Sequence, residues 1–189
     1  MTFDWNEVWD RHGQSESLDH MEVSGFQSFR DVDTENCAGK LIELCKIKPQ
    51  DTVLELGCGA GLLGRHLDKY CHYIGSDRSF AMVKKTIQLN HFSALAISAN
   101  DIVFKDKAID HVFAFSVFHY FPSYDYAKTA ISEMLRVARK SVCVSDIPTE
   151  SHDGNHLLFD EDFFEGWQIS EGLYPREHRR YTARLDLEV

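Results

Sequence analysis

The sequence predicts an α/β protein: a three-layer sandwich in which helices cover both faces of a seven-stranded, mostly parallel sheet. Two observations predict it. Between residues 53 and 145, short apolar segments alternate with segments of helical period, which is the pattern of βαβ units and a parallel sheet. Residues 167–169 and 181–189 then read as two strands with no crossover helix between them, so we expect an antiparallel C-terminal hairpin.

Five short apolar segments have the pattern expected of the parallel strands: 53–56, 73–76, 94–99, 110–116 and 141–145. The ligand crevice of such a sheet lies beyond the carboxyl ends of its strands. The residues at these ends are therefore the first candidates for a binding site: Gly57, Asp77, Ala99, Ser116 and Asp146.

The helices are predicted from apolar residues spaced three and four apart. One covers residues 38–45 and stops before Pro49, and another opens directly after Gly61. A third begins after Ser79, whose side chain can cap it, and the clearest helical face lies over residues 127–138.

The first part of the chain differs from this alternating pattern. Residues 1–34 mix Trp and Phe with many polar residues, and they predict a short helix followed by a loop near Gly25. We expect a single domain over residues 1–189, with residues 1–34 as an N-terminal lid segment and residues 35–189 as the core.

Composition limits the partners and the compartment. The chain has 30 acidic and 20 basic residues and a formal charge of −10, which argues against a nucleic-acid backbone as partner. No run approaches the roughly 18 uncharged apolar residues of a membrane span, and the acidic, aromatic N-terminus is not a secretory signal. Five cysteines without a C-x-x-C pair fit the reducing cytosol, so we expect a cytoplasmic protein.

The strongest motif consists of the first strand and the glycine-rich turn after it, Val53-Leu54-Glu55-Leu56-Gly57-Cys58-Gly59-Ala60-Gly61. Glycines in a strand-to-helix turn let the backbone approach a ligand closely, because they lack Cβ. The spacing can be read in two phases. Gly57, Gly59 and Gly61 form E-x-G-x-G-x-G, whereas Gly59, Gly61 and Gly64 form G-x-G-x-x-G, the pattern of dinucleotide sites.

Asp77, at the end of the second strand, fits both phases, because a carboxylate there can bind both hydroxyls of a ribose. Three features favour the first phase. Glu55 stands two residues before the first glycine, where a dinucleotide site usually has an apolar residue. The second phase starts later than the strand should end, and a closing antiparallel strand is not the dinucleotide topology.

On these residues the sequence resembles a class I S-adenosylmethionine-dependent methyltransferase of the methyltransferase-11-like, small-molecule type, which has a Rossmann-like fold. The resemblance rests on VLELGCGAG (53–61), YIGSD (73–77) and FKDKAIDHVFAF (104–115), and it covers roughly residues 35–189 in order. It implies S-adenosyl-L-methionine as cofactor and S-adenosyl-L-homocysteine as product.

The resemblance also implies roles at the amino-acid end of the cofactor. Gly57, Gly59 and the adjoining backbone at Cys58 would pack against that end. Glu55 would lie under the loop, near the ammonium group of the cofactor or ordering the loop itself.

At the nucleoside end, the resemblance implies that Asp77 holds the ribose hydroxyls and that Arg78 lies beside the adenine. Ser98-Ala99-Asn100 would meet the adenine edge, and Ser116 would close the pocket. Many members of the family have an acidic residue after the third strand. Here Ser98 stands at that position, and Asp101 could fill the role only in a shorter loop.

His119 is the candidate catalytic residue, because it follows the fourth strand and could act as a base or orient the acceptor. A structural histidine bonded to the backbone is the alternative, and the neighbouring Tyr120 is a weaker candidate. His152 and His156 have the spacing of metal ligands but lie in a predicted loop, so we expect no metal site.

Trp5 and Trp9 are four residues apart and share a face of the predicted N-terminal helix. They have two interpretations. They could pack the N-terminus onto the core, or they could cover the cofactor, whose sulfonium an aromatic face attracts.

The sequence therefore predicts an enzyme that transfers a methyl group to nitrogen or oxygen of a small-molecule acceptor. We expect no nucleic-acid or membrane partner and a monomer or homodimer. Two alternatives stay open: a nicotinamide-dependent reductase and a non-catalytic, cofactor-binding relative of the same fold. The Asn-Pro-Pro-Tyr-type motif of base methylation is absent after the fourth strand, where FSVFHY (115–120) stands.

Overall fold

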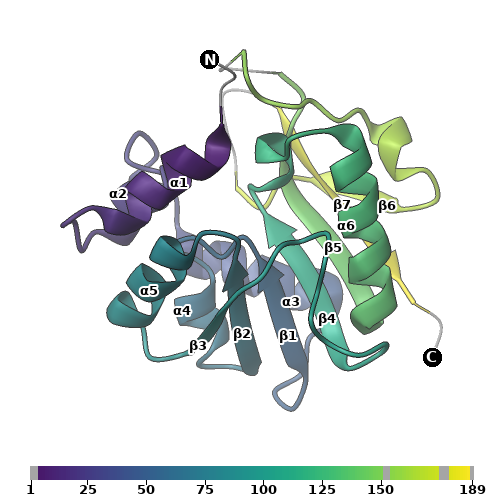
Figure 1. Ribbon diagram of the computed structural model, residues 1–189. Coiled ribbons are helices and arrows are strands. Elements are labelled where there is room, and N and C mark those ends of the chain that lie inside the picture. The colour runs from purple at the N-terminus through teal and green to yellow at the C-terminus, as the bar shows by residue number, and fades with distance from the viewer. Residues whose placement is uncertain (1–3, 151–153, 175–178, 188–189) are drawn as a thin grey trace.

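The computed structural model describes residues 4–150, 154–174 and 179–187, and it has the predicted α/β fold (Figure 1). One seven-stranded sheet has the order β3-β2-β1-β4-β5-β7-β6. Its parallel strands are β1 (Thr52–Leu56), β2 (His72–Asp77), β3 (Ser93–Ala96), β4 (Ile109–Phe115) and β5 (Ala138–Pro148). The remaining strands, β6 (Gln168–Glu171) and β7 (Arg180–Asp186), form the predicted antiparallel hairpin, in which β7 pairs with β5.

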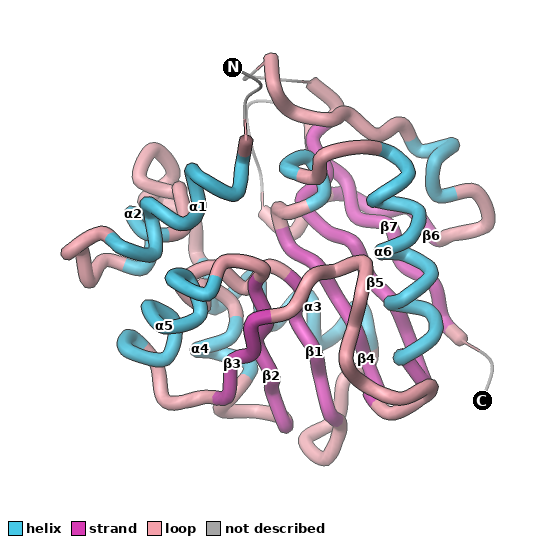
Figure 2. The backbone as a smooth tube through the Cα atoms, viewed as in Figure 1, coloured by secondary structure: helices cyan, strands magenta, loops and turns pink. Residues whose placement is uncertain are grey.

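Helices lie on both faces of the sheet, with α6 in front and α3 behind it in the view of Figure 2. The α-helices are α1 (Trp5–Gln14), α2 (His20–Val23), α3 (Thr34–Cys45), α4 (Gly64–Leu67), α5 (Phe80–Leu89) and α6 (Tyr124–Val137). Two short 3₁₀ helices are η1 (Phe118–Tyr120) and η2 (Glu161–Phe164). Ser79 caps α5 as predicted, since its Oγ accepts a hydrogen bond from the backbone N of Met82.

The central strands β1, β4 and β5 bury both of their faces, which explains their nearly unbroken apolar sequences. Because side chains alternate along a strand, neighbours enter different cores. Leu54 and Val112 face the core that α6 covers, whereas Val53 and Phe113 face the core that α3 and α4 cover. All seven residues of β4 are buried, so this strand forms the centre of the molecule.

The connection from β3 to β4 contains no helix within residues 97–108. Arg136 of α6 holds this segment in place: its guanidinium donates to the carbonyl oxygens of Ile102 and Phe104 at 2.8 and 2.9 Å, and it pairs with Asp106 at 2.8 Å. The chain leaves the sheet at Ala96, so the third strand is shorter than the predicted 94–99.

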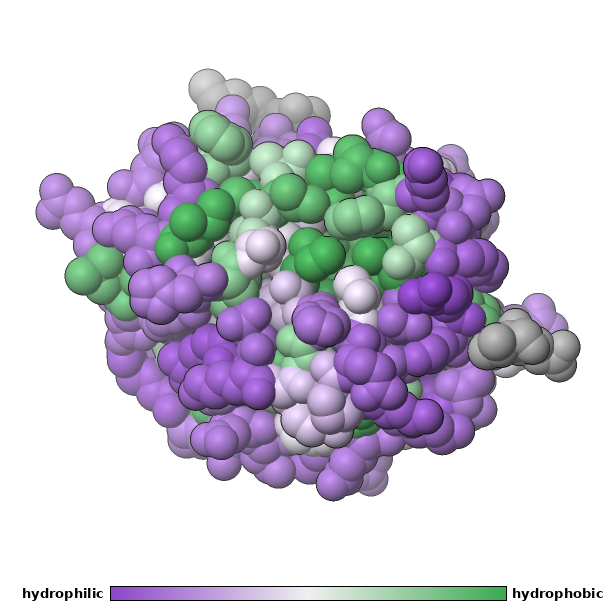
Figure 3. Space-filling view, turned by 90° about the horizontal axis from the view of Figure 1, so that it is seen from below, coloured by the Kyte–Doolittle hydropathy of each residue, from purple (hydrophilic) through white to green (hydrophobic). Residues whose placement is uncertain are grey.

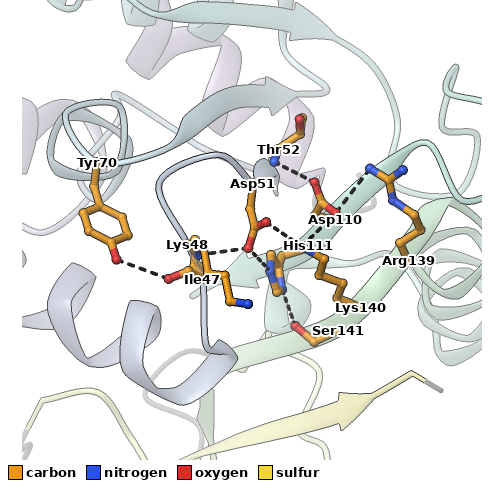
Figure 4. A network of polar contacts seen from close by, with 10 residues as sticks. All are labelled: Ile47, Lys48, Asp51, Thr52, Tyr70, Asp110, His111, Arg139, Lys140 and Ser141. Carbon is orange, nitrogen blue, oxygen red and sulfur yellow. Dashed lines mark hydrogen bonds and ion pairs between the residues drawn. The ribbon is translucent and has the colours of Figure 1, made fainter. Parts of the chain in front are cut away.

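A buried polar network ties β1, β4 and β5 together near their amino ends (Figure 4). His111 lies at its centre, with Nε2 3.0 Å from Asp51 Oδ2 and Nδ1 2.8 Å from Ser141 Oγ. Lys140 pairs with Asp51 and with Asp110, the latter at 3.2 Å. Lys140 and Arg139, which pairs with Asp110 at 3.2 Å, together balance the two carboxylates, and burial lowers the pKa of His111.

The face at the amino ends of the parallel strands is mainly hydrophilic around an apolar area (Figure 3). Phe80, Ile87 and Val103 are among the large apolar side chains exposed to solvent. Among the helices that the structure describes, none is both long and apolar enough to cross a membrane.

His111→Gln should make the protein less sensitive to mild acid. The pKa of His111 is lowered on folding, so the unfolded chain takes up a proton that the native state excludes. This contribution is present above about pH 6.5 and is lost as the pH falls, by up to about 1.4 kcal/mol per pH unit. Thermal unfolding from pH 7.5 to 5.5 should show a steeper loss for the wild type than for His111→Gln.

Some slope should remain in that variant, because burial also lowers the pKa of His20 and His66. His91→Gln, which changes an exposed histidine, is the matched control and should keep the wild-type slope. Equal slopes for His111→Gln and the wild type would contradict the account.

Candidate functional site

The glycine turn after β1 has backbone φ angles that residues with a side chain rarely adopt. Gly57, Gly59 and Gly61 all have positive φ, at 67°, 52° and 81°. A Cβ on Gly57 would also lie 2.5 Å from Val117 Cγ2. Gly64 is constrained differently, because its Cβ would lie 2.6 Å from the ring of Tyr73. The glycines of both possible motifs, E-x-G-x-G-x-G and G-x-G-x-x-G, are thus required by the structure. The glycine spacing alone therefore could not decide between the two motifs.

A cavity opens above this turn, at the carboxyl ends of β1, β2 and β4. Ten of the residues predicted to bind the cofactor line it: Trp5, Trp9, Glu55, Gly57, Cys58, Gly59, Asp77, Arg78, Ala99 and Ser116. Three other predicted residues, Ser98, Asn100 and His119, are not among those that line it.

Glu55 places a carboxyl group at the inner wall of the cavity, with 2% of the residue exposed. Its Oε2 accepts a hydrogen bond from the hydroxyl of Tyr73 on β2. Burial raises the pKa of Glu55 to about 8, which is the expected effect for an acid with one donor and no cation beside it.

Asp77 connects the end of β2 to the glycine turn. One carboxylate oxygen accepts from the backbone N of Gly59 at 3.2 Å, and the other accepts from that of Ser79 at 2.9 Å. Burial raises the pKa of Asp77 to about 6. Two acids with raised pKa values in one cavity mark a candidate functional site.

Two residues near the ends of β4 and β5 have unusual backbone geometry: Ser116, just after β4, and Asp146, two residues before β5 ends. Ser116 lines the cavity with φ at +57°, held by a 3.0 Å hydrogen bond from its N to the carbonyl of Ser145. Asp146 has φ at +61°, but it is buried and paired with Arg180 at 3.0 Å. Of these two predicted strand ends, only Ser116 belongs to the cavity lining.

After β3, the cavity wall is apolar. Ile97 and Ala99 line it, whereas the backbone of Ser98 bonds to that of Asp101 at 3.1 Å. The acidic contact after the third strand is therefore absent from the lining, and neither Asp101 nor Asn100 supplies it.

The N-terminal segment forms the roof of the cavity. Trp5 and Trp9 of α1 both line it, and both pack edge-on against Tyr120 of η1, with ring centroids 4.6 and 5.0 Å apart. Sequence reasoning gave Tyr120 little weight, although the residue stands beside His119. The two interpretations of the Trp pair therefore meet in one arrangement: the rings pack together and also face the cavity.

Close contacts hold this segment on α5. A Cβ on Gly13 would lie 2.4 Å from the backbone N of Met82, so the two helices touch through their backbones. Asp10 bonds to Ser79 at the start of α5, and Lys85 donates to the carbonyl of Ser15 at 2.6 Å.

The same segment also reaches the glycine turn. Ser24 Oγ accepts from the backbone N of Ala60 at 3.0 Å, and the ring of His20 lies 2.9 Å from the carbonyl of Ala60. The roof and the floor of the cavity are therefore joined by hydrogen bonds.

His119 lies behind the cavity lining. Only 1% of the residue is exposed, and its ring packs against those of Tyr120 and His156 at 4.0 and 4.8 Å. The alternative of a structural histidine thus has a clear basis. His152 lies outside the described residues, and among those residues no group of three His, Cys, Asp or Glu could hold a metal ion.

Comparisons with known proteins agree with this geometry. Residues 54–144 match the family model of a methyltransferase domain. No curated protein matches the sequence.

Solved structures share the fold at low identity. The N-methyltransferase NodS of Bradyrhizobium japonicum, in complex with S-adenosyl-L-homocysteine, is 15% identical with a TM-score of 0.72, covering 96% of this chain and 97% of its own. Magnesium protoporphyrin IX methyltransferase of Synechocystis, with S-adenosyl-L-homocysteine bound, is 16% identical with a TM-score of 0.69, covering 96% and 93%. Phosphoethanolamine N-methyltransferase 1 of Haemonchus contortus is 14% identical with a TM-score of 0.70, covering 96% and 48%.

Residues 54–144 therefore belong to the methyltransferase-domain family, and the chain has the fold of class I S-adenosylmethionine-dependent methyltransferases. The family match over residues 54–144 agrees with the predicted family, and both NodS and the magnesium protoporphyrin IX methyltransferase hold S-adenosyl-L-homocysteine, the product form of the predicted cofactor. The sheet order, with β7 between β5 and β6, differs from the dinucleotide order, so the nicotinamide alternative has no support in the fold.

Gly13→Ala should weaken cofactor binding although residue 13 does not line the cavity. The added methyl group meets the backbone of α5, so α1 must move and the roof must open. We expect calorimetry with S-adenosyl-L-homocysteine to show about a tenfold rise in Kd, equivalent to about 1.4 kcal/mol.

Gly39→Ala is the matched control, because a Cβ on this glycine of α3 meets no atom within 4 Å. It should leave Kd unchanged and stabilise the helix slightly. Wild-type affinity in Gly13→Ala would show that the roof does not contribute to binding.

Proposed function

We propose that this protein transfers the methyl group of S-adenosyl-L-methionine to a nitrogen or oxygen atom of a small-molecule acceptor. One observation carries the proposal: a single cavity has two acidic groups on the side of β1 and β2 and aromatic rings on the side of α1 and η1. The cofactor supplies an electrophilic methyl group on a sulfonium, and the protein positions the acceptor and excludes water.

The lining fits the cofactor at its amino-acid end. Gly57 and Gly59 expose backbone where a side chain would occupy the space, and Glu55 offers a carboxylate to an ammonium group. Cys58 lies in the same turn and is buried against it. These residues would hold the amino-acid end of the cofactor below the roof.

The lining also fits the nucleoside end. Asp77 would accept hydrogen bonds from the two ribose hydroxyls, and exposed Arg78 would lie beside the adenine. Ile97 and Ala99 give the adenine an apolar wall. Ser98 and Asn100 keep only an indirect part, since neither lines the cavity.

On the acceptor side, Ser116 and Tyr120 border the space that the cofactor would leave free. A hydroxyl acceptor would need a base and an amine must be neutral, so a proton has to leave either one. His119 is buried behind Tyr120 and would act as a positioning residue for that ring. Residues 1–34 would be the lid of a single domain, and residues 35–189 its cofactor-binding core. We also infer a cytoplasmic monomer or homodimer.

Asp77→Asn should weaken the binding of S-adenosyl-L-homocysteine. The substitution keeps the size of the side chain but removes the charge that would hold two ribose hydroxyls. Hydrogen bonds to a charged group contribute about 1.5–3 kcal/mol, so calorimetry should show a rise in Kd of at least about tenfold. Asp101→Asn changes an exposed carboxylate outside the cavity and serves as control. Unchanged affinity in Asp77→Asn would refute the ribose role.

Cofactor affinity should rise with pH between 6 and 8. Glu55 has its pKa raised to about 8, so at pH 6 its carboxyl must lose a proton before it can meet an ammonium group. Below that pKa each pH unit should lower Kd by up to about tenfold. Glu55→Gln should flatten the profile.

Tyr73→Phe should shift the pH dependence of cofactor affinity and not flatten it. The Tyr73 hydroxyl donates to Glu55 and so lowers its pKa; without it the profile should move to higher pH while keeping its slope. A wild-type Kd that is the same at pH 6 and pH 8 would show that Glu55 does not meet the ammonium group.

Turnover separates an enzyme from a non-catalytic relative. With methyl-labelled cofactor and a panel of amines, phenols and carboxylates, an enzyme should release S-adenosyl-L-homocysteine only when its acceptor is present. Tight cofactor binding without turnover on any panel member would favour the non-catalytic relative.

A further inference from the structure

Three aromatic rings stand together on the acceptor side of the cavity. Trp5 and Trp9 both pack against Tyr120, with centroids 4.6 and 5.0 Å from it and interplanar angles of 65° and 76°. All three residues line the cavity and are partly exposed, so their rings are accessible from it. Rings that only packed in the hydrophobic core would be buried and would not line the cavity.

Specific contacts position each ring. Trp5 stacks on His156 at 5.0 Å, and its Nε1 donates to the carbonyl of Asn155 at 3.2 Å. Trp9 lies over Gly25, where a Cβ would come within 3.1 Å of its Cη2. Contacts involving α1, η1 and the loop after β5 thus fix the positions of the rings.

The charges around the cavity favour a cation. Its lining contains three acidic side chains, Asp4, Glu55 and Asp77, and one basic side chain, Arg78. Glu55 and Asp77 lie at the cofactor end, and Arg78 directly follows Asp77. Near the rings, Asp4 is the charged lining residue, and it is exposed at the start of α1.

We propose that Trp5, Trp9 and Tyr120 bind an alkylammonium group, so that the acceptor is a small aliphatic amine methylated at its nitrogen. An aromatic face attracts a cation within about 6 Å of the ring centroid, and the carboxylates of Asp4 and Asp77 in the same lining add to that attraction. The assignment rests on the proposed function and adds the class of acceptor to it.

The chemistry requires the ammonium to lose a proton before transfer, and Asp4, which precedes Trp5 in the chain, is an exposed carboxylate of the lining that can accept it. The nitrogen lone pair then forms the N–C bond while the C–S bond breaks, and the electrons of that bond stay on sulfur. The positive charge passes from sulfur to nitrogen, so the methylated product is an ammonium ion as soon as it forms. The rings therefore bind substrate and product alike.

The test compares choline with 3,3-dimethyl-1-butanol, which has the same shape but no charge, by calorimetry in saturating S-adenosyl-L-homocysteine. We expect choline to bind at least about tenfold more tightly, and Trp9→Leu to abolish that preference, because leucine keeps apolar volume but has no aromatic face. Trp9→Phe should keep part of the preference. Tyr70→Leu, which removes an exposed aromatic ring outside the cavity, should keep all of it.

Equal affinity of the wild type for the two compounds would overturn the ammonium site, and so would a choline preference that survives in Trp9→Leu. Both results leave the proposed function standing, since cofactor is bound throughout. Failure of the wild type to bind S-adenosyl-L-homocysteine at all would instead refute the proposed function.

Discussion

The hydrogen bond from the backbone N of Gly59 to the carboxylate of Asp77 is the contact on which the site depends. It fixes the glycine turn of β1 against the end of β2, and it does so with a backbone group that positive φ angles turn toward the cavity. The geometry of the proposed cofactor side of the cavity depends on this hydrogen bond. The turn leaves room because it has no side chains, and Glu55 lies under it because β1 ends there. The same turn also carries Ala60, which anchors the roof through Ser24.

Much of this arrangement could be predicted from the sequence, because its causes are local. The glycine spacing, the strand ends at Gly57 and Asp77 and the Ser79 cap depend on neighbouring residues, and the cavity contains the residues predicted from them. The wall after β3 could not be predicted in the same way. Its lining depends on where Arg136, far along the chain, holds the loop 97–108, and no pattern within that loop records the contact.

Long-range packing also determines which histidines and aromatic rings line the cavity. The pattern after β4 gave no means of telling which of His119 and Tyr120 faces the cavity, since that depends on Trp5 and on the loop carrying His156. The network of Ser141, His111 and Asp51 is a related case. It joins the residue types of a hydrolase triad, but all three side chains are buried among the strands at the opposite end from the cavity. Residue chemistry without an accessible space gives stability and not catalysis.

The N-terminal roof couples ligand binding at the proposed cofactor side of the cavity to ligand binding at the proposed acceptor side. Residues 5–24 supply rings to the proposed acceptor side and hydrogen bonds to the glycine turn, so a ligand that orders the segment from either side would lower the ordering cost for the other. Linkage makes this reciprocal: whatever factor a bound cofactor adds to acceptor affinity, a bound acceptor adds to cofactor affinity. A single change in α1, remote from the sheet, can therefore alter selectivity for one ligand and residence time of the other together.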